Sequence, residues 1–365
     1  MEHPENEAQY AGLTVNAGVS QPPIVNPYAH RRVRRKPMPS ASELVEGILR
    51  GDITMLSRAV TLVESQNPAH YAVAQEVIEK CLPYSGRSRR IGITGVPGAG
   101  KSTSIDAFGL HVLKGGGKLA VLAIDPSSER TKGSILGDKT RMERLSIHDK
   151  AFIRPSPSAG SLGGVARKTR ETIVLCEAAG FNDIFVETVG VGQSETAVHS
   201  MVDFFLLIQL AGTGDELQGI KRGIMEMADG IVINKADGDN VERARLAQAQ
   251  FRSALHLFPA TQSGWKPEVL TYSGYYEIGV KEVWDMIDRY FEYARETGYF
   301  EHKRRQQSRW WMFESIDEQL RKNFYDNPSV AELLREKEED VLNRRITSFT
   351  AASEVLDFYF KGLKR

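Results

Sequence analysis

The chain has 365 residues, enough for one large domain with appendages or for about two domains. Its 47 lysine and arginine residues balance 47 aspartate and glutamate residues, so the formal net charge is zero and nothing in it indicates bulk nucleic-acid binding. The two cysteines, Cys81 and Cys176, lie far apart in no metal-binding spacing, which predicts free, buried thiols in a reducing compartment.

Residues 1–39 are rich in proline, asparagine and glutamine, and they predict a flexible arm. The start, MEHPENEAQY, has neither the basic and apolar regions of a secretory signal nor the arginine-rich character of a transit peptide. No run approaches the roughly 20 apolar residues of a membrane span. We therefore expect a cytoplasmic protein. For the basic run HRRVRRK at residues 30–36, we favour a solvated linker or a contact with the protein's own body over a nucleic-acid or anionic-surface contact.

Residues 40–82 repeat apolar side chains at helical spacing, interrupted at Gly51-Asp52 and at Asn67-Pro68. Ser40 or Ser42 can cap the first of these helices. We expect residues 40–86 to form a helical N-terminal module that leads into the first strand.

From residue 87 to residue 294, apolar strands alternate with helices. The expected strands are residues 89–94, 118–125, 151–156, 183–188, 202–210, 230–234 and 268–273. Continuous apolar strands separated by helices imply a parallel sheet covered on both faces. With right-handed crossovers this is a doubly wound α/β domain with a mostly parallel sheet, whose ligand site lies at the carboxyl ends of the strands.

Beyond residue 294 the strand signal stops, and residues 304–325 and 330–360 carry apolar side chains at helical spacing. Helices packed on their own domain and a dimerisation arm are both open. Trp310, Trp311 and the cluster Phe358-Tyr359-Phe360 are much apolar surface for a short appendage, so we treat residues 295–365 as a helical dimerisation arm.

The sequence GVPGAGKST at residues 95–103 matches the phosphate-binding loop G-x-x-x-x-G-K-[ST] at every fixed position. A strand precedes it and a helix is expected over residues 104–113, so backbone N–H groups and a helix N-terminus can face one anion. Lys101 can reach the terminal phosphates, and the Ser102 hydroxyl can ligate Mg²⁺, better than Thr103. The predicted phosphate-binding residues are Gly95, Val96, Pro97, Gly98, Ala99, Gly100, Lys101, Ser102 and Thr103.

The sequence NKAD at residues 234–237 follows a strand and matches the guanine-specifying N-K-x-D. The Asp237 carboxylate can accept from both N1–H and the amino group of guanine, a donor pair that adenine lacks. The Lys235 stem can lie along the base, and Asn234 can tie this segment to the phosphate loop. A backbone N–H of Ser273 or Gly274 can contact the guanine carbonyl. Together these residues predict GTP rather than ATP.

Acidic residues at the ends of strands are candidate Mg²⁺ ligands, because Mg²⁺ prefers hard oxygen atoms. Glu187 stands where many GTPases have the aspartate of D-x-x-G, with Gly190 as the glycine, and its longer side chain suits contact through a metal-bound water. Asp125 ends the second strand and opens a polar loop that contains Asp138. The predicted metal ligands are Ser102, Asp125, Asp138 and Glu187.

Two further residues are candidates for catalysis. Gln193 can position the attacking water, although it is displaced from the usual place directly after Gly190. Lys221 lies in GTGDELQGIKRG at residues 212–223, which indicates either a third mobile segment near the nucleotide or a capped helix start. The candidate catalytic residues are Lys101, Asp125, Asp138, Glu187, Gln193 and Lys221. Because the usual glutamine is displaced, we expect hydrolysis to be slow until a partner stimulates it.

Taken in order, the motifs GITGVPGAGKST, AIDPSS, GSILGDKTRM, FIRPSPSAGSLGGVARKTRE, ETVGVGQSE, GDELQGIKRG and NKAD closely resemble the MeaB/ArgK-type GTPases, which include the methylmalonic aciduria type A protein. The resemblance covers residues 40–290. It implies a homodimeric, Mg²⁺-dependent GTPase that binds methylmalonyl-CoA mutase or a related adenosylcobalamin-dependent acyl-CoA mutase, gates cobalamin loading and protects the mutase. It also implies that Asp125 and Asp138 lie in switch I, residues 187–193 in switch II and residues 212–223 in switch III.

Three other functions compete with this interpretation. A metal-inserting GTPase needs a thiolate or histidine cluster, whereas the two cysteines are isolated and the eight histidines are scattered. A small-molecule kinase should lack the N-K-x-D that ends at Asp237 and should have a lid for its acceptor. A nucleotide-locked scaffold without turnover is excluded poorly by the sequence.

Overall fold

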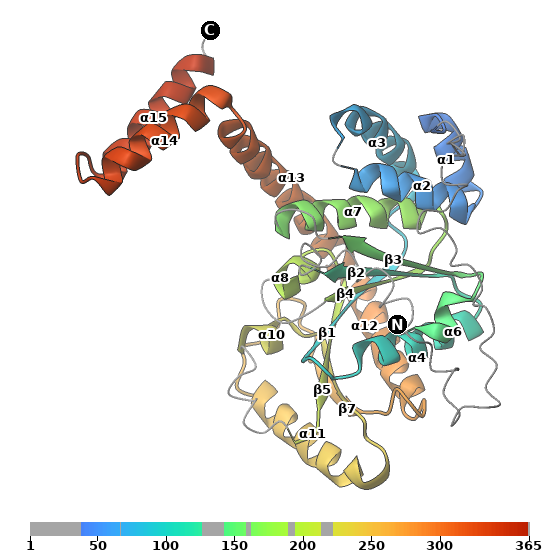
Figure 1. Ribbon diagram of the computed structural model, residues 1–365. Coiled ribbons are helices and arrows are strands. Elements are labelled where there is room, and N and C mark those ends of the chain that lie inside the picture. The colour runs from blue at the N-terminus through green and yellow to red at the C-terminus, as the bar shows by residue number, and fades with distance from the viewer. Residues whose placement is uncertain are drawn as a thin grey trace, which may run out of the picture. The chain divides into compact units, whose positions relative to one another are not determined.

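The computed structural model describes residues 38–65, 67–125, 142–157, 162–188, 194–212 and 222–363 (Figure 1). From Ser40 onward these residues belong to one compact unit. The finer domain boundaries at residues 87 and 295 remain predictions.

Seven parallel strands form one sheet, in the order β3-β2-β4-β1-β5-β6-β7. The strands are β1 (Arg89–Gly95), β2 (Leu119–Asp125), β3 (Ala151–Pro157), β4 (Asp183–Thr188), β5 (Phe204–Leu210), β6 (Gly230–Asn234) and β7 (Glu268–Thr271). β1 lies between β4 and β5, so that Ile93 is level with Glu187 on one side and with Leu206 on the other. The doubly wound α/β class is confirmed, and the strand pairing is parallel throughout the sheet.

Helices cover both faces of the sheet, because alternate strand residues contribute to two different cores. In β2, Ala120 and Leu122 join one core while Leu119 and Val121 join the other. The first core contains α7 (Leu162–Ala178), and the second contains α4 (Lys101–Lys114) and α12 (Val280–Glu296). The described residues of this region also form α6 (Glu143–Ser146), α8 (Ser194–His199), α10 (Arg222–Met227), η4 (Gly238–Asn240) and α11 (Val241–Leu255).

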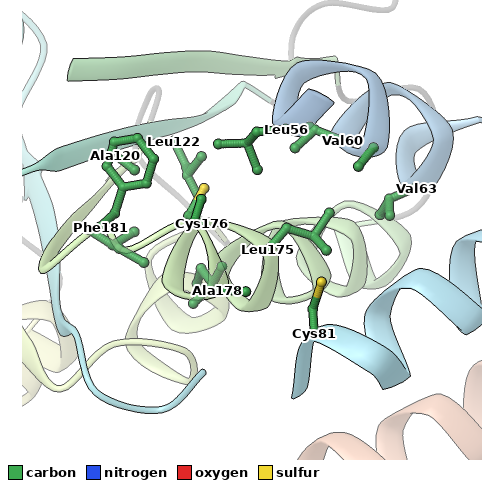
Figure 2. Packing of buried hydrophobic residues seen from close by; sticks show 14 of the residues in the cluster. Leu56, Val60, Val63, Cys81, Ala120, Leu122, Leu175, Cys176, Ala178 and Phe181 are labelled. Carbon is green, nitrogen blue, oxygen red and sulfur yellow. The ribbon is translucent and has the colours of Figure 1, made fainter. Parts of the chain in front are cut away.

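The predicted N-terminal module consists of α1 (Ala41–Leu49), α2 (Ile53–Glu64) and α3 (Pro68–Cys81), followed by the short η3 (Leu82–Tyr84). Ser40 and Glu43 form a reciprocal capping box at α1, and the side chains of Asp52 and Asn67 cap α2 and α3. The breaks that the sequence predicts are therefore helix caps. These helices lie over α7, and Figure 2 shows the apolar side chains of α2 facing those of α7.

Both cysteines are free and buried, as predicted. Burial among apolar side chains raises the pKa of Cys81 to about 11, and burial also raises the pKa of Cys176. Figure 2 shows Cys176 within the core between α7 and the sheet. Since a thiol must lose its proton to bind a metal, these cysteines are suited to packing rather than to metal delivery.

The C-terminal helices are α13 (Tyr299–Tyr325), α14 (Pro328–Leu342) and α15 (Ser348–Leu363). α13 begins before the predicted residue 304, because Gly298 at φ 71° allows the turn that separates it from α12. α14 and α15 share a small core of Val330, Val355 and Tyr359. Within the described residues, no helix is long and apolar enough to cross a bilayer.

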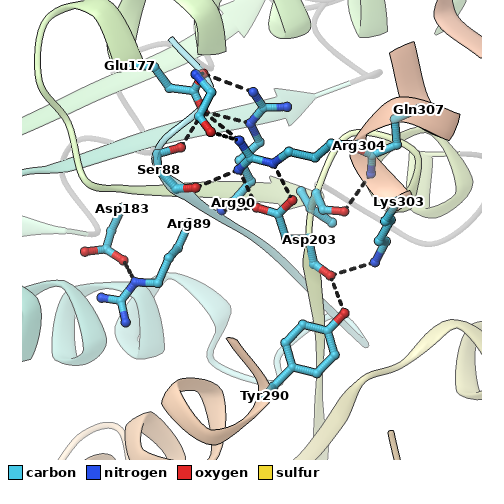
Figure 3. Close-up of polar contacts among 12 residues, drawn as sticks. Ser88, Arg89, Arg90, Glu177, Asp183, Asp203, Tyr290, Lys303, Arg304 and Gln307 are labelled. Carbon is cyan, nitrogen blue, oxygen red and sulfur yellow. Dashed lines mark hydrogen bonds and ion pairs between the residues drawn. The ribbon is translucent and has the colours of Figure 1, made fainter. Parts of the chain in front are cut away.

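A buried polar network attaches α13 to the amino ends of β1 and β5 (Figure 3). Arg304 donates to both Asp203 oxygens, at 2.9 and 2.7 Å, and to the Ser88 carbonyl at 2.6 Å. Arg90 donates to both Glu177 oxygens at 2.9 and 3.0 Å. These charges lower the pKa of Glu177 and of Asp203 against the opposing effect of burial. The network lies at the end of the sheet away from the carboxyl ends of the strands, so its charges are structural.

The half-buried ring of His199, at the end of α8, gives the fold a pH dependence. It contacts Phe205 edge to face, with ring centroids 5.6 Å apart. Burial and the charge of Lys303 lower the pKa of His199 from 6.5 to about 4. The folded protein therefore keeps this ring neutral where the unfolded chain already binds a proton. Its contribution to stability is complete above pH 6.5 and is lost as the pH falls toward 4.

We expect wild type to lose about 1.5 kcal/mol more unfolding free energy than His199→Phe between pH 6.5 and pH 5. The phenylalanine ring keeps the shape and the apolar contact but does not titrate. Urea unfolding at the two pH values measures the difference. Carboxyl groups titrate in both proteins, so the variant is the control for them. Equal losses in the two proteins would show that His199 stays neutral in the unfolded chain or is charged in the fold.

Candidate nucleotide-binding site

The predicted phosphate loop joins β1 to α4 directly. β1 ends at Gly95, and α4 begins at Lys101 rather than at residue 104, because Gly100 at φ 86° occupies the N-cap position. A Cβ on Gly95 would lie 2.2 Å from the Ile208 carbonyl oxygen of β5, and one on Gly100 would lie 2.6 Å from Asn234 Nδ2. Both glycines are therefore required by close approach of other segments.

Lys101 and Ser102 lie in the first turn of α4, a 14-residue helix, where the helix N-terminus favours a negative charge. Lys101 Nζ donates to the Gly95 carbonyl at 2.9 Å, so its side chain folds back over the loop. Burial lowers the pKa of Lys101, and the negative charges of Glu187 and Glu195 act in the opposite direction. The cation thus lies close enough to both acids to be affected by them.

Asn234, the last residue of β6, joins three segments. Its Nδ2 donates to the Ala99 carbonyl of the phosphate loop at 2.7 Å, which is the contact that the sequence predicts. Its Oδ1 accepts from the Gly274 N–H at 3.0 Å. The side chain is 3% exposed, so both bonds are shielded from water. NKAD, the loop after β7 and the phosphate loop are therefore held in one fixed arrangement.

The rest of NKAD turns sharply after Asn234. Lys235 has φ 59°, which is uncommon for a residue with a side chain, and its carbonyl accepts from Asn240 Nδ2 at 2.7 Å. The Ala236 N–H donates to the Tyr272 carbonyl at 3.0 Å. Lys235 is exposed and Asp237 is half-buried. The turn leaves both charged side chains accessible at the carboxyl edge of the sheet.

Ser273 and Gly274 lie beside Asn234, but their N–H groups already have protein acceptors. The Ser273 N–H donates to the Ile278 carbonyl at 2.9 Å, and the Gly274 N–H donates to Asn234. A guanine carbonyl would have to share these donors. Their predicted contact with the base therefore remains a prediction, whereas their support of Asn234 is a feature of the structure.

The predicted acids have different positions. Glu187 is 4% exposed in β4, level with Ile93 of β1 and Ala123 of β2. Asp125 is the last residue of β2. Asp138, Gly190, Gln193 and Lys221 lie outside the described residues. In the described part of the site, the charge of Glu187 raises the pKa of Lys101 against the effect of burial, and the roles of the other acids remain predictions.

The sequence patterns do not predict two features of this site. Glu195 is 1% exposed in the first turn of α8, and its charge acts on Lys101 together with that of Glu187. Its signal was an acid two residues after Gln193, at the start of a helix. The other is a hydrogen bond between Ser104 of α4 and Tyr272 after β7, for which no local sequence signal exists because the two residues are 168 positions apart.

A family model described as "Methylmalonyl Co-A mutase-associated GTPase MeaB" matches residues 56–329. The chain belongs to the MeaB family of GTPases. This confirms the family resemblance, the P-loop GTPase fold and GTP hydrolysis as the enzymatic activity.

Relatives of the MeaB family resemble this chain over most of its length. It is 48% identical to a probable GTPase of Mycobacterium tuberculosis over 314 residues, covering 86% of this chain and 94% of the relative. It is 43% identical to the GTPase ArgK of Escherichia coli over 317 residues, covering 87% and 96%. It is also 43% identical to the mouse mitochondrial methylmalonic aciduria type A homolog over 323 residues, covering 86% and 78%.

A solved structure titled as a LAO/AO transport system kinase has a similar fold. Its TM-score is 0.71 at 37% identity, and the match covers 87% of this chain and 97% of that one. The agreement over nearly all of that chain supports the arrangement of the sheet and its helices. The word kinase belongs to that protein's title, whereas the relatives from Mycobacterium tuberculosis and Escherichia coli are named as GTPases.

Proposed function

We propose that this MeaB-family GTPase is a nucleotide-dependent chaperone of methylmalonyl-CoA mutase, or of a related adenosylcobalamin-dependent acyl-CoA mutase. In this role it gates cobalamin loading and protects the mutase from inactivation. The observation that carries the proposal is the match of residues 56–329 to a family described by its association with that mutase. The similarity to the mouse methylmalonic aciduria homolog supports it independently.

The site residues have separate tasks in this proposal. Residues 95–103 hold the phosphates, with Lys101 beside the charge that develops on the γ-phosphoryl group. Asp237 reads the guanine, and Lys235 lies along the base. The Asn234 hydrogen bonds to Ala99 and Gly274 support a rigid connection between these two halves. A preformed site of this kind stabilises the transition state without a large reorganisation.

Magnesium fits the donors present at the carboxyl edge. Ser102 offers a hydroxyl in the first turn of α4, and Glu187 offers a buried carboxylate in β4. Both are hard oxygen donors, and Mg²⁺ usually binds one or two protein groups together with water and phosphate oxygens. When bound, the ion would neutralise charge on the phosphates. We propose Ser102 as a direct ligand, Glu187 as a ligand through water, and Asp125 and Asp138 as the other candidates.

The remaining predicted residues are assigned to the response to GTP and to the partner. Gly190 would sense the γ-phosphate through its N–H, Gln193 would position water, and Lys221 would respond to the partner. Because the usual glutamine is displaced, we expect intrinsic hydrolysis to be slow. Partner binding would then decide how long the GTP state lasts.

We also propose a homodimer that uses the C-terminal helices. α13 exposes large apolar side chains along its second half, and α15 does so near its end. They include Trp310, Met312, Phe313, Ile316, Leu320, Phe358 and Phe360, which are 45–58% exposed. The concentration of exposed apolar side chains on α13–α15 supports a second copy of this chain as the partner that covers them. A cytoplasmic location remains a prediction.

Mutase capture from cell extract tests the chaperone role. The full chain is immobilised without nucleotide, with GDP, or with a non-hydrolysable GTP analogue, and retained proteins are identified by mass spectrometry. We expect a cobalamin-dependent mutase whose amount changes with the nucleotide. Asp237→Asn is the control: because it should bind guanine nucleotides about 10⁴-fold more weakly, it should retain the mutase equally in all three conditions. Absence of any such mutase from the wild-type captures would contradict the proposal.

A further inference from the structure

Two neighbouring carbonyls of the phosphate loop are connected to the base-recognition half of the site, one directly by Asn234 and one through Ser104 of α4. The Ala99 carbonyl accepts from Asn234, as described above. The Gly100 carbonyl accepts from Ser104 Oγ at 2.8 Å, and this oxygen lies 2.5 Å from the phenol oxygen of Tyr272. The N-K-x-D motif accounts for the hydrogen bond of Asn234. It does not account for the second link, which runs from Tyr272 through Ser104 to Gly100.

The direction of the second link follows from the number of hydrogens. A serine hydroxyl has one hydrogen, and the Gly100 carbonyl can only accept. Ser104 therefore donates to Gly100 and accepts from Tyr272, which donates its phenol hydrogen. Ser104 is 0% exposed and Tyr272 is 1% exposed, so water does not compete for either bond. The result is a directed chain from Tyr272 through Ser104 to Gly100.

Tyr272 is itself fixed to the base-recognition segment. Its N–H donates to the Ile233 carbonyl and its own carbonyl accepts from the Ala236 N–H, both at 3.0 Å. It therefore brackets Asn234 and Lys235 through its backbone. Its ring stacks on Phe108 of α4, with centroids 5.4 Å apart, so the phenol has little freedom to turn away from Ser104.

We propose that Tyr272 is a positioning residue, whose hydroxyl sets the start of α4 relative to the guanine-binding segment. The proposal deepens the nucleotide-binding role proposed for residues 95–103 and 234–237, and it rests on that role. Gly100 begins the turn that carries Lys101 and Ser102. Loss of the phenol hydrogen would release one restraint on this turn while the apolar contact with Phe108 stays. Tyr272 thereby makes phosphate affinity depend on how the base segment is held.

Binding of GDP and GMP to the full chain tests this, by calorimetry or by competition with a fluorescent guanine nucleotide. We expect Tyr272→Phe and Ser104→Ala each to weaken GDP binding about fivefold, the effect of losing one neutral hydrogen bond. The double variant should be no weaker than the single ones, because both changes break the same chain. GMP affinity should change less than twofold, because GMP lacks the β-phosphate that such loops cradle.

Tyr290→Phe is the matched control. It also removes a buried phenol hydroxyl, which donates to the Asp203 carbonyl at 2.9 Å at the opposite end of the sheet. It should lower the melting temperature without changing GDP affinity. Unchanged GDP binding in Tyr272→Phe, additive effects in the double variant, or equal losses for GDP and GMP would each overturn the proposal. If neither wild type nor Tyr290→Phe bound a guanine nucleotide, the assignment of residues 95–103 and 234–237 as the nucleotide-binding site would itself be overturned.

Discussion

Asp237→Asn is expected to weaken GTP binding by about 10⁴-fold and to admit xanthosine triphosphate. The carboxylate accepts two hydrogen bonds from guanine, whereas the asparagine amide offers one donor and one acceptor. Xanthine has a carbonyl in place of the guanine amino group, so it matches the variant. The position is well defined in the fold, because Ala236 is bonded to the Tyr272 carbonyl and Asn234 is bonded to Ala99 and Gly274.

Competition titrations with GDP and xanthosine diphosphate measure this change of preference. Asp239→Asn is a matched control, since Asp239 is an exposed aspartate two residues further along the chain. It should bind GDP as wild type does. If Asp237→Asn kept the wild-type preference for guanine, another residue would have to read the base.

Lys101→Ala should reduce kcat/KM for GTP by about 10³-fold, the upper range for removing one charge-stabilising donor. The lysine lies at the start of α4, where its charge adds to the field of the helix N-terminus. Burial already lowers its pKa, so its removal should cost the fold little. The loss should therefore appear in hydrolysis rather than in the melting temperature.

Phosphate release under Mg²⁺ measures the effect, and melting curves check the fold. Lys114→Ala is the control from the other end of the same helix, where the side chain is 70% exposed and pairs with Glu277. It should retain wild-type turnover. Wild-type turnover in a well-folded Lys101→Ala would refute the role of the phosphate loop.

Much of the fold could be predicted because its signals are local. Continuous apolar strands such as β4 indicate a parallel sheet with two covered faces. The caps at Ser40, Asp52 and Asn67 mark helix starts within a few residues. Strand order is different, because it depends on which strands meet in space. No run of residues shows that β4 lies between β2 and β1.

The candidate site likewise contains features that the local sequence predicts and features that only the tertiary fold creates. The phosphate loop and NKAD are visible in the sequence because their chemistry needs fixed residue types at fixed spacing. The bond from Tyr272 to Ser104 is not, since it joins two ordinary residues through the tertiary fold. The predicted helix start at residue 104 also lies three residues after the observed start at Lys101. The helix begins earlier because Gly100 occupies the N-cap position. Its backbone lies so close to the side chain of Asn234, far along the chain, that a Cβ there would clash with it.

The most direct measurement is the steady-state rate of phosphate release from GTP and from ATP by the purified full chain with Mg²⁺. The geometry around Asp237 and Lys101 predicts hydrolysis of GTP, with kcat/KM for ATP lower by at least about 10³-fold because adenine leaves the carboxylate unpaired. Adding purified methylmalonyl-CoA mutase should raise the GTP rate and leave the ATP rate low. Equal hydrolysis of the two nucleotides would contradict the account.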